Sequence, residues 1–179
     1  MIKTVIAAAL TLAALPAASL AQDAAGPDAA RFYGTLGYSQ IDTAQATLGA
    51  LTVRGGWKTR PWLGFEAEAS VGVEDDTFDV STGVTGGVVE LKHDVAAYAV
   101  AFMPIGEHVE LFARGGYGST RIEASTPAVT PADGESFNYG MGVSAFHGVN
   151  GLRADWSRKD FTDNGGEADS WTVSFIRRF

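Results

Sequence analysis

The chain has no cysteine among its 179 residues. This absence excludes a disulfide framework and any metal site built on thiolates. Long apolar runs are missing too: after residue 21 the longest is 95–103, which has nine residues, whereas a spanning helix needs about 20. Basic residues are few, 13 Lys and Arg against 21 Asp and Glu, which gives a net charge of −8. That balance argues against nucleic acid or an anionic membrane surface as the partner.

The first 21 residues have the pattern of a secretory signal. A short basic start, residues 1–3, precedes an apolar stretch at 5–15 that Pro16 ends. Ser19 and Ala21 then supply small residues at the −3 and −1 positions of a cleavage site. We therefore expect a cleaved signal peptide at 1–21 and one exported domain at 22–179.

The rest of the chain alternates apolar with small, polar or charged residues, which is the period of a strand. Segment 95–103 is rich in alanine, but its bulky residues Tyr98, Val100 and Phe102 recur at every second position. We expect these three side chains to form the apolar face of a strand. The pattern predicts eight strands, at 31–40, 48–59, 63–73, 94–103, 109–119, 137–145, 152–159 and 170–179.

Short and long connections alternate between these strands. Residues 59–62, 104–108 and 147–151 are rich in turn formers, whereas 41–47, 74–87, 120–135 and 160–169 are longer and polar. This alternation is typical of outer-membrane barrels, whose short turns face the periplasm.

Alternate positions of a strand point to the same face, and we call each such set of positions a phase. The phase that carries the charged residues indicates which face is inside. In a small membrane barrel the apolar phase faces lipid and the charged phase faces the lumen. Four basic and four acidic residues fall in that phase, so we expect them to neutralise one another as a luminal charge network. They are Arg54, Lys58, Glu66, Glu68, Glu110, Arg114, Arg153 and Asp155.

Aromatic residues occur near both ends of the strands, as the two interfaces of a bilayer favour. Those expected near the turns are Trp57, Trp62 and Phe179, and those near the long loops are Tyr38, Tyr117, Phe137 and Trp171. Backbone groups in lipid have no water to bind, so the strands must close on themselves. The predicted fold is all-β: an eight-stranded antiparallel up-and-down transmembrane β-barrel.

Segments 31–39, 63–68 and 110–118, together with the terminal Phe179, resemble the small eight-stranded outer-membrane β-barrel family of the OmpA and OmpX type, also called porin family proteins. The resemblance implies a bacterial outer-membrane location, contact with outer-membrane lipid, and insertion by the barrel-assembly machinery. It also implies an assembly signal on the last strand, formed by Trp171, Val173, Phe175 and Phe179. Arg177 stands where the family often has an aromatic residue. We expect a monomer.

The residues give little support for an enzyme or a cofactor. The three histidines, His93, His108 and His147, fall at opposite ends of the expected strands and cannot form one triad or metal site. The run 147–150 also lacks the His-x-Ser-Asn pattern of lipid A deacylases with this architecture.

Acidic residues gather in two of the expected loops. Such oxygen ligands can hold calcium, but their spacing matches no defined cation loop, and a solvated surface is the better interpretation. The acidic loop residues are Glu74, Asp75, Asp76, Asp79, Asp160, Asp163, Glu167 and Asp169.

Eight strands enclose a lumen that side chains fill, whereas aqueous porins have sixteen or more. The expected function is therefore non-enzymatic, in envelope structure or surface interaction. Two alternatives stay open: a narrow channel or conduit for small or hydrophobic solutes, and a soluble secreted barrel that binds a ligand inside.

Overall fold

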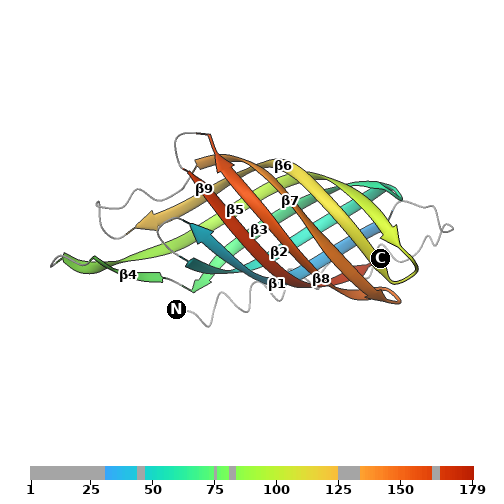
Figure 1. The fold of residues 1–179 in the computed structure, drawn as a ribbon, viewed down its shortest axis with the longest axis horizontal. Coiled ribbons are helices and arrows are strands. Elements are labelled where there is room, and N and C mark those ends of the chain that lie inside the picture. The colour runs from blue at the N-terminus through green and yellow to red at the C-terminus, as the bar shows by residue number, and fades with distance from the viewer. Residues whose placement is uncertain (1–30, 44–46, 75, 81–83, 125–133, 163–165) are drawn as a thin grey trace.

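The computed structural model describes residues 31–43, 47–74, 76–80, 84–124, 134–162 and 166–179. The predicted signal peptide at 1–21 lies outside these residues. The described part forms one sheet of nine strands (Figure 1). They are β1 (Arg31–Thr43), β2 (Thr47–Arg60), β3 (Leu63–Glu74), β4 (Asp76–Val80), β5 (Val84–Ile105), β6 (Val109–Ala124), β7 (Gly134–His147), β8 (Asn150–Phe161) and β9 (Glu167–Arg178).

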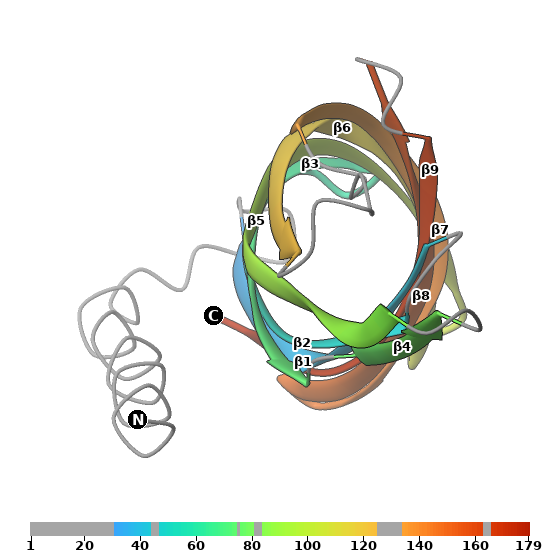
Figure 2. The same ribbon diagram turned by 90° about the vertical axis from the view of Figure 1, so that its left-hand side faces the viewer.

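All strand pairs are antiparallel, and the sheet closes on itself. β1 pairs with both β2 and β9, and β3 pairs with β5, which completes the ring that Figure 2 shows from one end. β4 continues the line of β3 and pairs only with the first part of β5. Eight strands therefore form the ring, all except β4, and the predicted eight-stranded up-and-down barrel is confirmed. Among the described residues, no helix is long and apolar enough to cross a membrane.

Short turns connect the strands at one end of the barrel, which we call the turn end. The turns between β5 and β6 and between β7 and β8 contain Gly106 and Gly148, whose φ angles are 70° and 63°. Glycine adopts this left-handed conformation without the steric cost that other residues have. β1 starts and β9 stops at the same end; β1 ends and β2 begins at the opposite end, which we call the loop end (Figure 1).

The loop-end boundaries differ from the prediction. Residues 74–87 were expected to form a loop, but they contain β4 and the start of the 22-residue β5. β6 also continues past residue 119 to Ala124. Acidic and glycine residues in these segments suggested a loop, whereas Val84, Val88 and Val89 favour a strand. β4 and the start of β5 form a hairpin. This hairpin and the end of β6 extend beyond the rest of the barrel at the loop end (Figure 1).

The outer face of the barrel is apolar and the inner face carries the charge. Leu152, Met141 and Val173 are each more than 60% exposed on the outside, whereas Arg54, Arg114 and Arg153 are at most 5% exposed on the inside. A soluble barrel has the reverse arrangement, because it must turn its polar side chains to water. This exterior suits lipid.

One predicted face was wrong. Tyr98, Val100 and Phe102 are 2%, 0% and 6% exposed and lie inside the barrel, whereas Val95 and Met103 face outward at 46% and 57%. The turn-end half of the lumen holds an apolar cluster that these bulky side chains help to fill. Ala97, Ala99 and Ala101 of β5 lie on the lipid side, because filling the lumen requires volume.

Candidate functional site in the barrel lumen

Apolar and charged side chains together fill the lumen. An apolar cluster lies toward the loop end, formed by Ile41, Leu48, Ala50, Leu91, Phe161 and Ala168. A second apolar cluster lies toward the turn end and includes Tyr33, Phe102, Phe112 and Phe146. The charged residues occupy the middle of the lumen, beside Tyr98 and Val100 of the second cluster, and a smaller space next to the turns. The candidate site is this charged middle of the lumen.

Arg54 of β2 forms the first half of the central cluster. Its Nε donates to Oε2 of Glu68 at 2.5 Å. Its Nη1 and Nη2 donate to the two carboxylate oxygens of Asp155 at 2.8 and 3.0 Å. Two parallel bonds of this kind hold a guanidinium and a carboxylate in one plane. Arg54 thus connects β3 on its own side with β8 on the far side of the ring.

Arg114 of β6 binds the same two carboxylates. Its Nη1 donates to Oε2 of Glu68 at 2.8 Å, and its Nη2 donates to Oδ2 of Asp155 at 3.1 Å. Ser157 accepts a further bond from Nη2 at 2.5 Å. The two arginines lie close together because two carboxylates stand between them. We call Arg54, Glu68, Arg114 and Asp155 the central cluster; each of these side chains is at most 5% exposed.

Arg153 and Glu66 form a second ion pair beside the central cluster. Nη1 and Nη2 of Arg153 donate to the two carboxylate oxygens of Glu66 at 2.5 and 3.2 Å. The hydroxyl of Tyr33 also donates to Glu66, at 2.6 Å. The Arg153 guanidinium lies 3.7 Å from the centroid of the Phe112 ring, an additional favourable contact for a cation. Both charged side chains are fully buried.

Tyr33 can approach Glu66 only because the neighbouring strand has a glycine. A Cβ atom on Gly56 would lie 2.1 Å from the Tyr33 ring. Gly56 therefore makes room for the ring inside the barrel.

Lys58 and Glu110 are apart from the other six predicted luminal residues. The Lys58 Nζ lies 2.5 Å from Oε2 of Glu110, and Arg178 is 3.7 Å from the same oxygen. This pair is nearer the turns and more exposed, at 14% and 9%. The structure thus places all eight residues on the inner face, six of them in the middle and two near the turn end.

A further buried ion pair, between Asp94 and Lys159, was not predicted. Lys159 binds Asp94, which also accepts a 2.7 Å bond from Thr120. Lys159 has the same strand phase as Arg153 and Asp155, which is a usable signal. Asp94 was missed because the face of its strand was assigned the wrong way round. Hydroxyl groups add to the polar lining, for example Ser39 with Thr52 at 2.6 Å.

The residues predicted to form the assembly signal lie on the outer face of β9 and at its end. Trp171, Val173, Phe175 and Phe179 are 60%, 64%, 49% and 46% exposed. The backbone N–H of Phe179 donates to the carbonyl of Phe32 at 2.8 Å, so the last residue is tied to β1.

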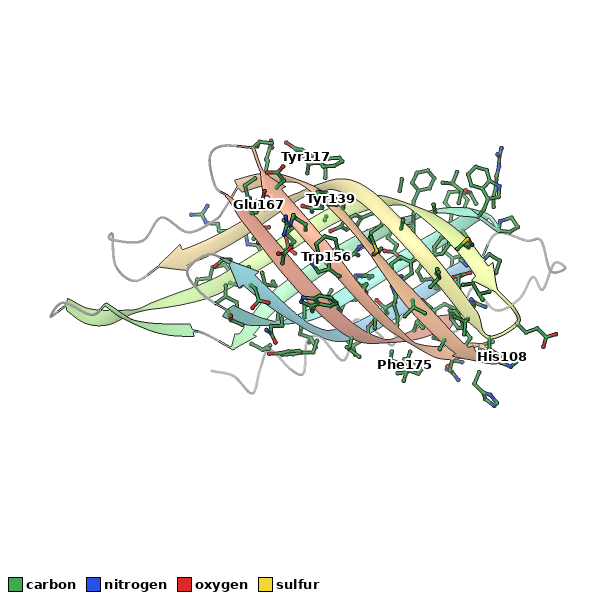
Figure 3. The ribbon with its side chains drawn as sticks, viewed as in Figure 1. His108, Tyr117, Tyr139, Trp156, Glu167 and Phe175 are labelled. Atoms are coloured by element: carbon green, nitrogen blue, oxygen red, sulfur yellow. The ribbon has the colours of Figure 1, made fainter. Side chains whose placement is uncertain are left out.

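Most of the predicted acidic loop residues belong to strands. Glu74 ends β3, Asp76 and Asp79 lie in β4, Asp160 lies in β8, and Glu167 and Asp169 begin β9. Asp75 and Asp163 lie outside the described residues. Arg158 on the outer face binds Glu167 at 3.1 Å and Asp169 at 2.9 Å, at the end marked by Glu167 and Tyr139 in Figure 3. Among the described residues, no group of three or more His, Cys, Asp or Glu is placed to hold a metal ion.

Several solved structures of bacterial barrel proteins have a similar fold. Ail of Yersinia pestis, the attachment invasion locus protein, in complex with the heparin analogue sucrose octasulfate, has 16% identity and a TM-score of 0.57, over 84% of this chain and 99% of that one. Neisserial surface protein A has 13% identity and a TM-score of 0.54, over 83% and 95%. The N-terminal barrel domain of OprF from Pseudomonas aeruginosa has 9% identity and a TM-score of 0.51, over 82% and 96%. These likenesses show the fold alone.

Among curated proteins, no relative matches this chain. The family model described as the outer membrane protein beta-barrel domain matches residues 5–179. The chain therefore belongs to this family, and the protein is a β-barrel of the bacterial outer membrane.

Proposed function

We propose that this protein is a non-enzymatic barrel with a closed lumen that contributes to envelope structure or to surface contacts. The observation that carries the proposal is the central cluster. Arg54 and Glu68 come from β2 and β3, whereas Arg114 and Asp155 come from β6 and β8. Neither of the first two strands pairs with either of the last two, so the ion pairs of Arg54 with Asp155 and of Arg114 with Glu68 cross the lumen.

The cluster supports a closed barrel because an ion would have to displace buried, paired charges in order to pass. Separating such a pair costs about 3–5 kcal/mol. Tyr98 fills space beside the charges, because its ring centroid lies 4.4 Å from the Arg114 guanidinium. The narrow lumen of an eight-stranded barrel adds to this. The proposal therefore favours a sealed barrel over the channel alternative.

The placement of the histidines and carboxylates supports a non-enzymatic role. His93 is exposed toward the loop end, whereas His108 and His147 are exposed at the turn end, where Figure 3 labels His108. The carboxylates of Glu66, Glu68 and Asp155 accept hydrogen bonds from arginines. Carboxylates held in this way are poor general bases.

The loop end supports a role in surface contact. β5 and β6 continue beyond the other strands there, and segments 74–80 and 160–169 carry the acidic residues. The structure of Ail contains a sulfated sugar analogue. Arg158 neutralises part of this charge, and the net negative charge that remains on these segments would repel such a polyanion. We therefore propose that a surface partner of this protein is neutral or cationic.

Planar bilayer recordings test the closed lumen. The refolded parent should show no sustained conductance, and regular open steps would refute the proposal. The variant R54A/D155A opens the central cluster and should gain conductance. The matched variant K58A/E110A removes an ion pair near the turn end and should stay closed. Different mobilities of boiled and unboiled samples in detergent gels verify that each variant is folded.

A further inference from the structure

A groove crosses the outer face of the barrel near the turn end, over β9, β1, β2 and β3. Its floor consists of small residues in register: Gly34 pairs with Gly55, and Gly55 pairs with Ala67. A Cβ atom on Gly55 would meet nothing within 4 Å, so the floor is open to the membrane. The groove holds about 680 Å³. This volume is within the range of ligand pockets, roughly 300–1,000 Å³.

Apolar side chains form the turn-side wall of the groove. Phe32, Trp57 and Phe65 follow one another in register across β1, β2 and β3. The rings of Phe32 and Trp57 stack with centroids 6.1 Å apart, and the three side chains are 44–51% exposed.

The opposite wall is formed by Phe175, Leu36 and Val53, which are also consecutive in register. The two walls border a row one residue wide, and the Phe179 ring lies next to this row, 3.8 Å from the position of a Cβ atom on Gly34. This shape and polarity fit a hydrocarbon chain.

One end of the floor carries a positive charge. Arg177 of β9 pairs in register with Gly34, so it continues the row of Gly34, Gly55 and Ala67. Its side chain is exposed on the outer face, with the guanidinium 5.8 Å from the centroid of the Phe179 ring. A guanidinium binds a phosphate through two parallel hydrogen bonds. Arg177 therefore offers a phosphate site at the mouth of an apolar groove.

The depth of the residues matches a lipid molecule. Arg177 is next to the last residue of β9, whereas Gly55 and Ala67 lie further from the turn-side ends of β2 and β3. The turn end of such barrels faces the periplasm. The groove thus runs from the headgroup level of the periplasmic leaflet toward the membrane interior.

A second groove on the same barrel provides a comparison. It lies over β5 to β9 and β1, and its lining includes Met103, Met141 and Trp171. Among the described residues that line it there is no lysine or arginine. It therefore offers an apolar surface without a site for phosphate.

We propose that the groove floored by Gly34, Gly55 and Ala67 binds one anionic phospholipid of the periplasmic leaflet, with its phosphate on Arg177 and an acyl chain between the two walls. This site adds a ligand to the protein. It does not depend on the closed lumen, so either proposal can fail without the other.

Quenching of Trp57, which lies in one wall, tests the site. A variant that keeps only this tryptophan (W62F/W156F/W171F) is reconstituted in phosphatidylcholine vesicles that contain a small fraction of dibrominated phosphatidylglycerol or dibrominated phosphatidylcholine. We expect the anionic lipid to be enriched roughly two- to fivefold beside Trp57, as an exposed ion pair allows. R177Q should abolish this preference, and G55L should abolish it by filling the floor.

Two matched substitutions distinguish binding in the groove from general effects of removing a charge or adding a side chain. R60Q removes an exposed charge at the turn end that does not line the groove, and G115L adds the same side chain at another glycine whose Cβ would meet nothing within 4 Å. Both should keep the preference. A variant with only Trp171 reports on the second groove and should be quenched equally by the two lipids.

Three results would overturn the site: equal quenching of Trp57 by the two lipids in the parent, a preference that survives R177Q, or the same preference at Trp171. Loss of the preference in R60Q as complete as in R177Q would also overturn it, because the attraction would then be a general charge effect. Detergent-gel mobility before and after boiling shows that each variant is folded.

Discussion

Glu66 is bound by both Arg153 and Tyr33 in a part of the lumen that is closed to solvent. Replacing it with glutamine leaves the buried Arg153 guanidinium with only the longer contact of its Nε to Asp155, at 3.5 Å. We expect E66Q to lower the free energy of unfolding by about 3–5 kcal/mol. Urea titrations in lipid vesicles measure this change.

The double variant E66Q/R153M is the control for that prediction. It removes both charges, so the cost should be smaller than for E66Q alone. The two single variants each lose some free energy of unfolding. If the double variant loses more than these two losses together, charge compensation does not hold the pair together.

Ala99 tests the corrected face of β5. It is exposed on the outside, next to the buried Val100. A99R places a charge in the hydrocarbon near the middle of residues 94–105, the part of β5 within the barrel, and should destabilise the barrel by about 2–4 kcal/mol. Vesicle unfolding curves provide the measurement. Unchanged stability of A99R would show that Ala99 does not face lipid.

The inner face was predictable from the sequence where one phase of a strand is charged. Arg54, Glu68, Arg114 and Asp155 each alternate with apolar or small residues, so charge decides the side. Val100 was not predictable in this way, because both phases of its segment are apolar. There the deciding factor is the volume left in the lumen, and that depends on Phe112 and Phe146 from other strands.

At the scale of single elements, β9 carries the residues that we propose the assembly machinery reads. Phe179 extends this strand and is tied to β1 through its backbone, so its ring can be removed without loss of that bond. F179A should slow insertion by the purified assembly machinery more than spontaneous folding into thin vesicles. I105A, which removes another exposed apolar side chain near the turn end, should affect the two rates equally. Equal slowing by both variants would contradict the proposal.

The hairpin at the loop end should be the least protected part of the described sheet. β4 has five residues and pairs only with β5. Residues 94–101 of β5, in contrast, pair with β3 on one side and with β6 on the other. Amides with few cooperative neighbours open at low free energy. Hydrogen exchange should therefore be faster in β4 than in residues 94–105. Equal protection would show that the hairpin and the barrel open as one unit.

The strands of this hairpin were not predicted from the sequence. The turn-end connections have clear turn formers such as Gly106 and Gly148, and their positions agree with the structure. At the loop end, acidic residues and β-branched residues give opposite indications within 74–89. The strand forms because β5 has partners there, which is a tertiary effect that local composition does not contain.

At the scale of the whole molecule, the closed ring was predictable because every strand alternates and because lipid tolerates no open edge. Which acidic residue pairs with which basic residue inside the barrel was harder to predict. The balance of four acids and four bases indicates neutralisation, but it does not tell which carboxylate meets which guanidinium. Contacts such as Arg54 with Asp155 depend on the tilt and closure of the strands.

The central cluster has a consequence for the rate at which the barrel unfolds. Arg54 and Asp155 are 101 positions apart in the chain and lie on opposite sides of the seam between β1 and β9. We expect opening of that seam to separate the two charges before water replaces their hydrogen bonds, which raises the activation barrier. Contacts made only after the seam closes slow unfolding without speeding folding. The protein should therefore show hysteresis, remaining folded in urea concentrations at which the unfolded chain does not insert.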